Sequence, residues 1–518
     1  MFKKSPSTKQ FDMFNSPSSM MCVRESRYYD DPSNWHIKFY EEITSRIDET
    51  IFKPLFTEGN ENGKDGRPNA SIRIIIAMCV IKEGYGYSDE TLFEICRFHV
   101  LYRRALGLIG MDEQCPSLGA YYALRKRICE YEEQTGVNLF EECFKNITRK
   151  QIKTYQISGK SVRMDSKLIS SNIAWYSRYE IIHKTFLQAT QDYNRFRITD
   201  RMLRQQYMEF REEDASKTVY RTEPEEMGNR LLRLGLVIDY ILTHSRKSEH
   251  PLLERVFNEQ YEKDKDGTVS VRDKKLVSPK SLQNPNDPDA QYRNKGGKVV
   301  KGYSANLTET TDEKGKPSLI TDIQVKGASA PDNGYLEDAI RNTEEVTGNK
   351  VDVAYADGAY QSEDNRKLTA DGEHGFELVS SGIQGKPGRF ELNLIDDNTL
   401  EVTDRETSEV TTAIPTRNME QWKVNVKDKK GKSVWKYFGK EHIEKAEARR
   451  KIDSVPIEKR MKRNNVEATI FQYCFHTRNN KTRYRGLLKH KLQAFARGLW
   501  INMRRLFIFD RKMQVQVA

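Results

Sequence analysis

Three carboxylates stand at positions where they could share a metal ion. Asp357 follows the alternating run 351–355 and precedes a glycine, which is typical of a buried strand that ends at the rim of a sheet. Asp165 lies in a second strand-like run, 161–165, and Glu467 lies in a basic helical segment nearer the C-terminus. Ligands collect at the carboxyl ends of strands in open α/β sheets, and carboxylate oxygens suit hard divalent cations. The three residues therefore predict a metal-binding catalytic site.

Each carboxylate also has a structural explanation. An Asp before a Gly is most often a turn residue, and Asp165, which precedes a serine, can cap the segment after it. Glu467 lies four residues after Arg463, a spacing that is usual for an ion pair on one helix face. These alternatives stay open for each residue alone, whereas the three together with the surrounding basic residues favour catalysis.

Positive charge gathers near the C-terminus. Residues 459–518 contain 15 Lys and Arg against two acids, a net +13 in a chain whose total is +11. Such a footprint is typical of a phosphate-binding surface, and a solubilising tail is the alternative. The candidate DNA contacts in this region are Arg460, Arg463, Lys481 and Arg483.

The N-terminal region predicts successive short helices. Ser88 is a candidate N-cap, Pro116-Ser117 opens another helix, and Arg125, Lys126 and Arg127 are displayed along that second helix. Short helices with a basic last member suit a helix-turn-helix-like DNA reader. An ordinary helical bundle with a solvated charged face explains these residues equally well.

The rest of the chain predicts an α/β protein with two insertions. Helical spacing and strand-like alternation indicate an order of strands, helix, strand, helix and strand, which gives a mixed sheet. The expected organisation is a poorly ordered segment 1–33, an all-helical DNA-binding domain 34–150, a catalytic domain 157–510 interrupted by a helical insertion 176–263 and a β insertion 385–440, and a basic C-terminal helix and tail 480–518. Residues 264–297 are expected to be an exposed connection, and residues 457–476 one helix.

Composition excludes several other classes of protein. No stretch approaches the roughly 20 apolar residues that span a bilayer, and the start has no apolar signal core. The seven cysteines are scattered singly, which indicates reduced thiols in a cytoplasm and argues against zinc. We therefore expect a cytoplasmic protein with no membrane partner.

Three motifs, in this order, resemble the DDE transposases of the IS1182 group, within the broader IS4/IS5-like set. They are the runs that begin at Met164-Asp165, at Tyr355-Ala-Asp357-Gly-Ala-Tyr and at Arg463-Asn-Asn-Val-Glu467. The resemblance extends over most of the chain, from about 35 to 509, and includes the helical region 66–128.

The resemblance implies an RNase H-like sheet with Asp165 and Asp357 on adjacent strands and Glu467 on a helix packed against them. It implies that these three residues are catalytic and hold two Mg²⁺ or Mn²⁺ ions, which clamp the attacking and leaving oxygens of a phosphodiester. It also implies double-stranded DNA as partner, both as element ends and as target, with a homodimer on the DNA.

The chain departs from the family's basic motif at two positions. That motif has the form Tyr, two residues, Arg, three residues, Glu, six residues, Lys. Arg463 and Glu467 match, but Arg460 replaces the tyrosine and Cys474 replaces the lysine. Arg460 can still hold a phosphate, whereas Cys474 cannot, so Lys481 or Arg483 would have to supply that contact.

Three functions follow as hypotheses. The first is a transposase that binds its terminal inverted repeats, cuts the DNA and joins it to a target. The second is a DNA-binding transposase remnant without catalysis, and the third is an RNase H-like nuclease without strand transfer.

Overall fold

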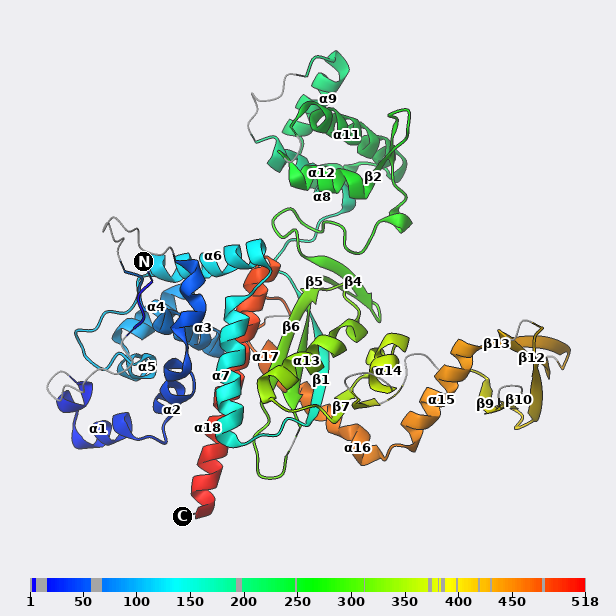
Figure 1. The fold of residues 1–518 in the computed structure, drawn as a ribbon. Coiled ribbons are helices and arrows are strands. Elements are labelled where there is room, and N and C mark those ends of the chain that lie inside the picture. The colour runs from blue at the N-terminus through cyan, green and yellow to red at the C-terminus, as the bar shows by residue number, and fades with distance from the viewer. Residues whose placement is uncertain are drawn as a thin grey trace.

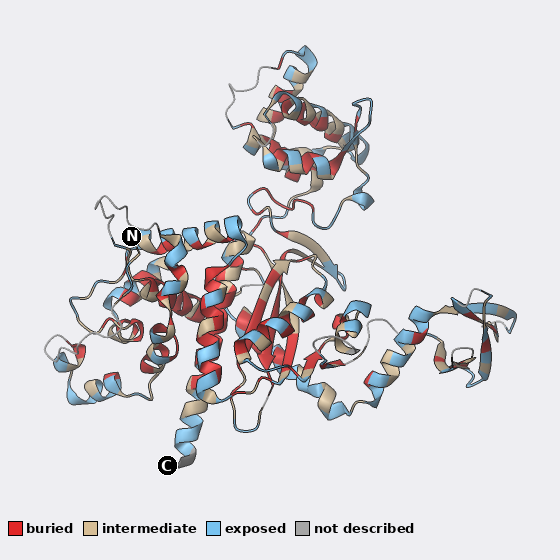
Figure 2. Ribbon diagram, viewed as in Figure 1, coloured by how far each residue is buried: buried red, intermediate tan, exposed pale blue. Residues whose placement is uncertain are grey.

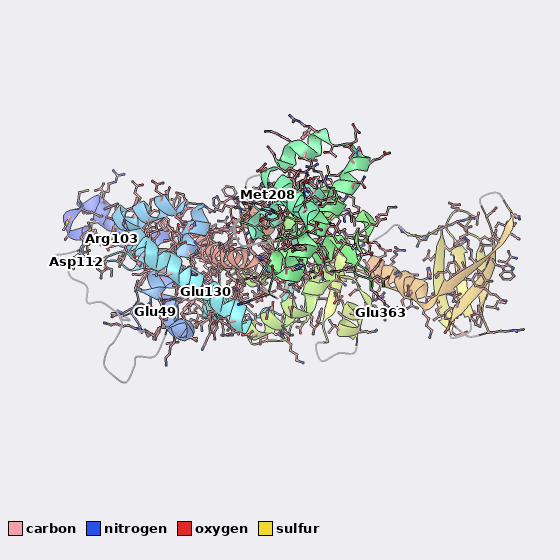
Figure 3. The ribbon with its side chains drawn as sticks, turned by 90° about the horizontal axis from the view of Figure 1, so that it is seen from above. Glu49, Arg103, Asp112, Glu130, Met208 and Glu363 are labelled. Carbon is pink, nitrogen blue, oxygen red and sulfur yellow. The ribbon has the colours of Figure 1, made fainter. Side chains whose placement is uncertain are left out.

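The computed structural model shows an elongated molecule with a mixed sheet at its centre (Figure 1). It describes all of the 518 residues except 1, 6–15, 57–67, 192–197, 247–248, 312, 371–374, 381, 383–386, 397–398, 418–419, 429–430, 478–479 and 518. Helices from the N-terminal region and a small β-sheet module lie at opposite ends, as the view from above also shows (Figures 1 and 3). The sheet that carries Asp165 lies between them.

The N-terminal region is helical. Its elements are α1 (Val23–Asp30), α2 (Trp35–Glu42), α3 (Ile72–Tyr85), α4 (Asp89–Phe98), α5 (Val100–Leu106), α6 (Leu118–Thr135) and α7 (Leu139–Tyr155), with 3-10 turns η1 (Pro17–Met20), η2 (Thr44–Arg46) and η3 (Glu49–Leu55). Ser88 and Ser117 cap α4 and α6 through their hydroxyls, as the sequence predicts. The expectation that residues 1–33 are poorly ordered is wrong for 16–33, because Tyr29 of α1 is buried and accepts a hydrogen bond on its carbonyl from His36.

The central sheet has the order β4-β5-β1-β7-β8, and β6 also pairs with β5. Its strands are β1 (Ser161–Ser170), β4 (Gln291–Lys295), β5 (Lys298–Thr310), β6 (Ile320–Gly327), β7 (Val353–Ala356) and β8 (Glu377–Ser380). β1 is antiparallel to β5 and parallel to β7, which is itself parallel to β8, so the sheet is mixed as predicted. β4 lies in the segment 264–297, which we expected to be an exposed connection. It is a short polar edge strand, so it lacks the alternation of apolar and polar residues by which a half-buried strand can be predicted.

Helices cover both faces of this sheet. On one face, α13 (Leu336–Thr347) packs Leu336, Ala339 and Ile340 against Val162 and Met164 of β1. On the other face lie α17 (Asn465–Cys474) and α18 (Leu487–Val517), which share a core with the N-terminal helices and with β5 and β6. Figure 2 shows the buried residues concentrated in the strands and in the α18 turns beside them.

α18 joins the N-terminal helices to the sheet. Trp500 packs directly on Gly84 of α3, and Ile323 of β6 packs directly on Gly498 of α18. A Cβ at either glycine would overlap these side chains, so both positions require the absence of a side chain. The N-terminal region and the sheet therefore form one continuous hydrophobic core.

Two insertions project from the sheet (Figure 1). The helical insertion comprises α8 (Arg178–Ala189), α9 (Arg201–Glu212), α10 (Ala215–Arg221), α11 (Pro224–His244) and α12 (Pro251–Gln260), then β2 (Tyr261–Lys263), β3 (Val269–Val271) and the turn η5 (Lys274–Leu276). It has its own hydrophobic core. The β insertion comprises β9 (Phe390–Asp396), β10 (Thr399–Asp404), β11 (Val410–Pro415), β12 (Gln421–Lys427) and β13 (Ser433–Gly439).

The segment between the β insertion and the sheet is not one helix. α15 (Lys440–Ser454) leads to α16 (Ile457–Met461), a 3-10 turn η8 (Lys462–Asn464) and then α17. The single helix expected over 457–476 is therefore wrong. Asn464 and Asn465 have low helix propensity, and the 3-10 turn lies against β1 and β7. No helix in the described part of the chain is both long and apolar enough to cross a bilayer.

Candidate functional site

Asp165 and Asp357 lie side by side on adjacent parallel strands. Arg163 of β1 is the register partner of Tyr355 of β7, and each aspartate follows its strand neighbour by two residues. The two side chains are therefore level and point to the same face of the sheet. Asp357 stands directly after the last residue of β7 and caps the 3-10 turn η7 (Gly358–Tyr360) by accepting the Gly358 N–H at 2.6 Å.

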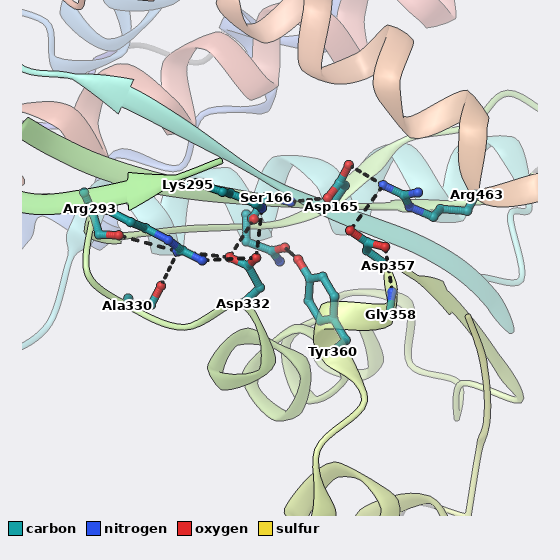
Figure 4. Close-up of polar contacts among 12 residues, drawn as sticks. Asp165, Ser166, Arg293, Lys295, Ala330, Asp332, Asp357, Gly358, Tyr360 and Arg463 are labelled. Carbon is teal, nitrogen blue, oxygen red and sulfur yellow. Dashed lines mark hydrogen bonds and ion pairs between the residues drawn. The ribbon is translucent and has the colours of Figure 1, made fainter. Parts of the chain in front are cut away.

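Arg463 of η8 bridges the two carboxylates (Figure 4). Its Nη2 lies 3.0 Å from Asp165 Oδ2 and 4.0 Å from Asp357 Oδ2. The Asp165 side chain is 15% exposed and that of Asp357 is 41% exposed, so the pair opens to solvent on the Asp357 side. Burial raises the pKa of Asp165, and the Arg463 charge opposes that rise.

Tyr360 ties the turn after Asp357 to the strand beyond Asp165. It is fully buried, and its hydroxyl donates a 2.6 Å hydrogen bond to Asn306 Oδ1 on β5. Asn306 is the register partner of Ser166, the neighbour of Asp165. A side chain anchored after β7 thus crosses beneath β1 to reach β5, which fixes the turn that begins at Asp357 relative to Asp165.

A buried carboxylate, Asp332, supports β1 from the opposite face (Figure 4). It accepts the Ser166 hydroxyl at 2.9 Å, Arg293 at 3.2 Å and Lys295 at 3.3 Å. Arg293 also donates to the Ala330 carbonyl at 2.7 Å. These bonds connect β1 to the edge strand β4 and to the turn η6 (Asp332–Tyr335), which leads into α13.

A second buried charge cluster docks α17 on the sheet. Glu309 of β5 is fully buried and accepts Arg163 at 2.5 Å, Arg505 at 2.6 Å and the Thr469 hydroxyl at 2.6 Å. Thr469 lies on α17, two residues after Glu467. Because the carboxylate is paired from three sides, its burial is compensated, and Thr469 of α17 is held at the level of Glu309 and its register partner Arg163.

Glu467 does not join the two aspartates in this structure. It lies in the first turn of α17 and is exposed, while Val466, Thr469 and Ile470 of the same helix are buried. No group of three or more His, Cys, Asp or Glu among the described residues is arranged to hold a metal ion. The sequence-predicted triad is therefore present as an aspartate pair, with the third carboxylate on the flank of the adjacent helix.

The aspartate pair fits a divalent cation as two of its ligands. Both carboxylates lie within 4.0 Å of one positively charged nitrogen, so a single cation can neutralise them together. Carboxylate oxygen is the donor that Mg²⁺ and Mn²⁺ prefer. The Arg463 guanidinium supplies the compensating positive charge here and occupies the side of the pair that faces α17.

The basic residues predicted to contact DNA differ in how many bonds they make within the protein. Lys481 donates to the Ile173 carbonyl, and Arg483 donates to the carbonyls of Gly86 and Tyr87. Arg460 is half-buried, 3.6 Å from Asp453. The charges of Lys481 and Arg483 thus brace backbone segments.

The three basic residues of α6 also differ. Arg125 packs over the rings of Tyr121 and Tyr484, so it is largely covered. Lys126 and Arg127 are exposed, and Lys126 lies 3.4 Å from Glu130. Only the latter two are displayed along the helix as the sequence predicts.

Lys167 lies near Cys474, the position at which the motif that this chain resembles has a lysine. It follows Asp165 by two residues on β1, so both side chains point to the α17 face. Its positive charge lowers the pKa of Cys474 against the larger effect of burial, which raises it. Sequence reasoning assigned no role to Lys167, Tyr360 or Asp332, although Tyr360 belongs to the motif that contains Asp357.

One comparison with known proteins gives a match. Residues 28–127, which comprise most of the N-terminal helices, match the family model described as a transposase domain (DUF772). That match supports a transposase family for this chain. Neither a curated protein nor a solved structure matches it significantly.

Proposed function

We propose that this protein is a DNA transposase of the DDE kind, whose catalytic carboxylates are Asp165, Asp357 and Glu467. The observation that carries the proposal is the level placement of Asp165 and Asp357 on adjacent parallel strands, bridged by Arg463. The transposase-domain match of residues 28–127 supports DNA processing as the class of reaction. An RNase H-like arrangement of the sheet is part of the same proposal.

In this mechanism Asp165 and Asp357 would hold a divalent cation, with Glu467 as the third candidate ligand from the start of α17. When bound, Mg²⁺ or Mn²⁺ activates the attacking oxygen and stabilises the leaving oxygen of a phosphodiester. Arg463, which contacts Asp165 and lies near Asp357, is also one helical turn from Glu467, and it would be available to pair with a DNA phosphate if a cation neutralised the two aspartates. Tyr360 holds the turn after β7 on β5, and Asp332 connects β1 to β4, so the two aspartates keep their positions.

A cleavage assay tests the proposal. The full chain is incubated with DNA that carries the element's ends, with Mg²⁺ or with EDTA, and binding is measured in parallel by mobility shift. We expect metal-dependent cutting that falls by about 10³-fold in Asp165→Asn, because several kcal/mol of charge stabilisation is lost, while DNA binding persists. Loss of specific binding in Asp165→Asn would mean that this carboxylate is structural.

Glu467→Gln provides the sharper variant because Glu467 is exposed and the substitution should leave folding intact. We expect lost cutting with an unchanged urea midpoint. Normal cutting by Glu467→Gln would mean that Glu467 is not a catalytic residue.

A DNA-binding protein without cleavage is the second candidate. The separation of Glu467 from the aspartate pair and the Cys474 departure favour it. Salt-sensitive binding of element ends without cutting in any metal would establish that function instead.

A further inference from the structure

The β insertion presents one uncovered sheet face. Alternate residues of β9–β13 point inward, where Leu392, Leu400, Val402 and Trp422 form a core with Ile443 of α15. The other alternate residues form the outer face, which we define as Glu391, Asn393, Ile395, Glu401, Thr403, Val410, Thr412, Ile414, Lys423, Asn425, Lys427, Trp435 and Tyr437. α15 packs on the inner side of this sheet, and its Arg450 reaches Asn393 of the outer face at the β9 edge.

Five large apolar side chains are exposed on the outer face. They are Ile395 at 61%, Val410 at 55%, Ile414 at 54%, Trp435 at 50% and Tyr437 at 55%. Scattered apolar residues are normal on a surface, but five on one side of a single small sheet form a patch that marks an interaction site. Figures 1 and 3 place this module at one end of the molecule, away from the N-terminal helices.

Charge is divided across the same face. Residues 417–440, which contain β12 and β13, carry a net +6, whereas residues 389–409, which contain β9 and β10, carry a net −5. On the outer face itself this places Lys423 and Lys427 on β12, and Glu401 and Glu391 on β10 and β9. The apolar strand β11 lies between the two halves.

Such a face is complementary to itself. Consider two copies whose outer faces meet, related by a two-fold axis that runs parallel to β11 between the faces. In this arrangement β11 of one copy lies over β11 of the other. The strands β12 and β13 then lie over β10 and β9 of the second copy. Ile414 and Val410 then meet their own equivalents at the axis. Ile414 pairs with Lys423, and Lys423 pairs with Tyr437, so these three residues lie at one end of the sheet. Ile395 of β9 lies at the same end. Tyr437 of one copy therefore comes opposite Ile395 of the second copy.

The charges match in the same arrangement. Glu401 is in register with Thr412, between the levels of Val410 and Ile414, so it comes under β12 of the second copy between its two lysines. The phosphates of DNA would be attracted to the lysines of the basic half of the face but repelled by the carboxylates of the acidic half. A second copy satisfies both halves.

We propose that the outer face of β9–β13 binds the same face of a second copy of this chain, by sheet-on-sheet packing about β11. Strands about 4.8 Å apart and residues about 3.4 Å apart give a face on the order of 500 Å² per copy. A total near 1,000 Å² is at the low end for specific interfaces, so the dimer should be weak, in the micromolar range.

Sedimentation velocity of the full chain, without DNA or metal, tests the interface from about 1 to about 100 µM. We expect a concentration-dependent dimer, and at least a tenfold weaker one for Ile414→Asp, because two carboxylates then face each other at the axis. The matched control is Tyr220→Asp, an equally drastic change at a 95% exposed residue of α10 in the helical insertion. A wild-type chain that stays monomeric, or an Ile414→Asp variant that still dimerises, would overturn the proposal.

Charge exchange gives the decisive test. The lysine variant Lys423→Glu/Lys427→Glu and the acidic variant Glu391→Lys/Glu401→Lys should each dimerise at least tenfold more weakly than the wild type, and a mixture of the two should form a heterodimer. A lysine variant that keeps its dimer but loses affinity for a single-stranded oligonucleotide would reassign the face to DNA and refute the proposal. Since no cleavage is measured, failure of the transposase proposal would leave this result unaffected.

Discussion

Arg463 donates a 3.0 Å hydrogen bond to Asp165 and lies 4.0 Å from Asp357, so one guanidinium neutralises both carboxylates. The same two carboxylates are the proposed cation ligands. A cation and this arginine therefore compete for the same negative charge, and the competition can be measured without DNA.

Arg463→Met should raise the affinity for Mn²⁺ by about tenfold, because removal of one nearby positive charge favours a second cation by at least about 1.4 kcal/mol. Electron paramagnetic resonance of free Mn²⁺ measures the dissociation constant. Arg460→Met is the control, since Arg460 lies 3.6 Å from Asp453 rather than beside the aspartate pair. Equal affinities for wild type and Arg463→Met would mean that the aspartates do not bind the metal.

Tyr360→Phe should lower the free energy of unfolding by about 1–2 kcal/mol, because the buried Asn306 loses its partner. It should also weaken Mn²⁺ binding, because the turn that begins at Asp357 loses its anchor on β5. Tyr335→Phe is the matched control: its buried hydroxyl bonds the Ser304 carbonyl on the same sheet face but does not hold Asp357. If both variants affect Mn²⁺ equally, Tyr360 has no positioning role.

Lys167→Met should weaken binding of element ends and reduce the dependence of that binding on salt by about one phosphate contact. The physical reason is that Lys167 lies on the same side of β1 as Asp165 and is close enough to Cys474 for its charge to lower the pKa of that thiol. Lys160→Met, which removes an exposed lysine just before the same strand, is the control. An unchanged dependence of binding on salt would mean that Lys167 does not supply the phosphate contact that Cys474 cannot make.

Asp322 predicts a pH dependence of stability. Burial raises its pKa to about 6, although Gln324 and Asn342 donate hydrogen bonds that oppose the rise. Between about pH 4 and pH 6 the folded chain keeps a proton that the unfolded chain has released, so this residue's contribution to stability falls as pH rises, by up to about 3 kcal/mol. The fall is complete above pH 6.

Asp322→Asn removes this titration. Its free energy of unfolding relative to the wild type should therefore shift in favour of the variant between pH 4 and pH 7, as measured by urea denaturation. Asp338→Asn, at an exposed carboxylate of α13, should show no such shift. A constant difference between Asp322→Asn and wild type over this range would contradict the raised pKa.

The helical N-terminal region, the mixed sheet and the strands of Asp165 and Asp357 could be predicted because their signals are local. Ser88 and Ser117 are N-cap residues that predict the start of a helix. Larger apolar residues alternate with smaller or more polar ones before Asp357, and the glycine after it predicts the end of the strand. Strand adjacency came only from the family resemblance, because pairing between residues 192 positions apart leaves no mark in either strand.

The rest of the site depends on tertiary contacts. Arg463 lies at 4.0 Å or less from both aspartates only because η8 breaks the helix expected over 457–476, and that break is stabilised by packing against β1 and β7. Tyr360 and Asp332 act across strands, from turns whose sequence could equally be exposed. The covering of Arg125 by Tyr484 likewise joins residues from opposite ends of the chain.

α18 follows every other described element in the sequence, and it carries Leu492, Phe495, Leu499, Trp500 and Met503 into the core of the first helices. Because a chain is synthesised from its N-terminus, α3 and α7 are made long before α18, and their α18-facing sides stay uncovered until α18 emerges. A chain truncated before residue 487 would therefore leave the N-terminal part of this core uncovered.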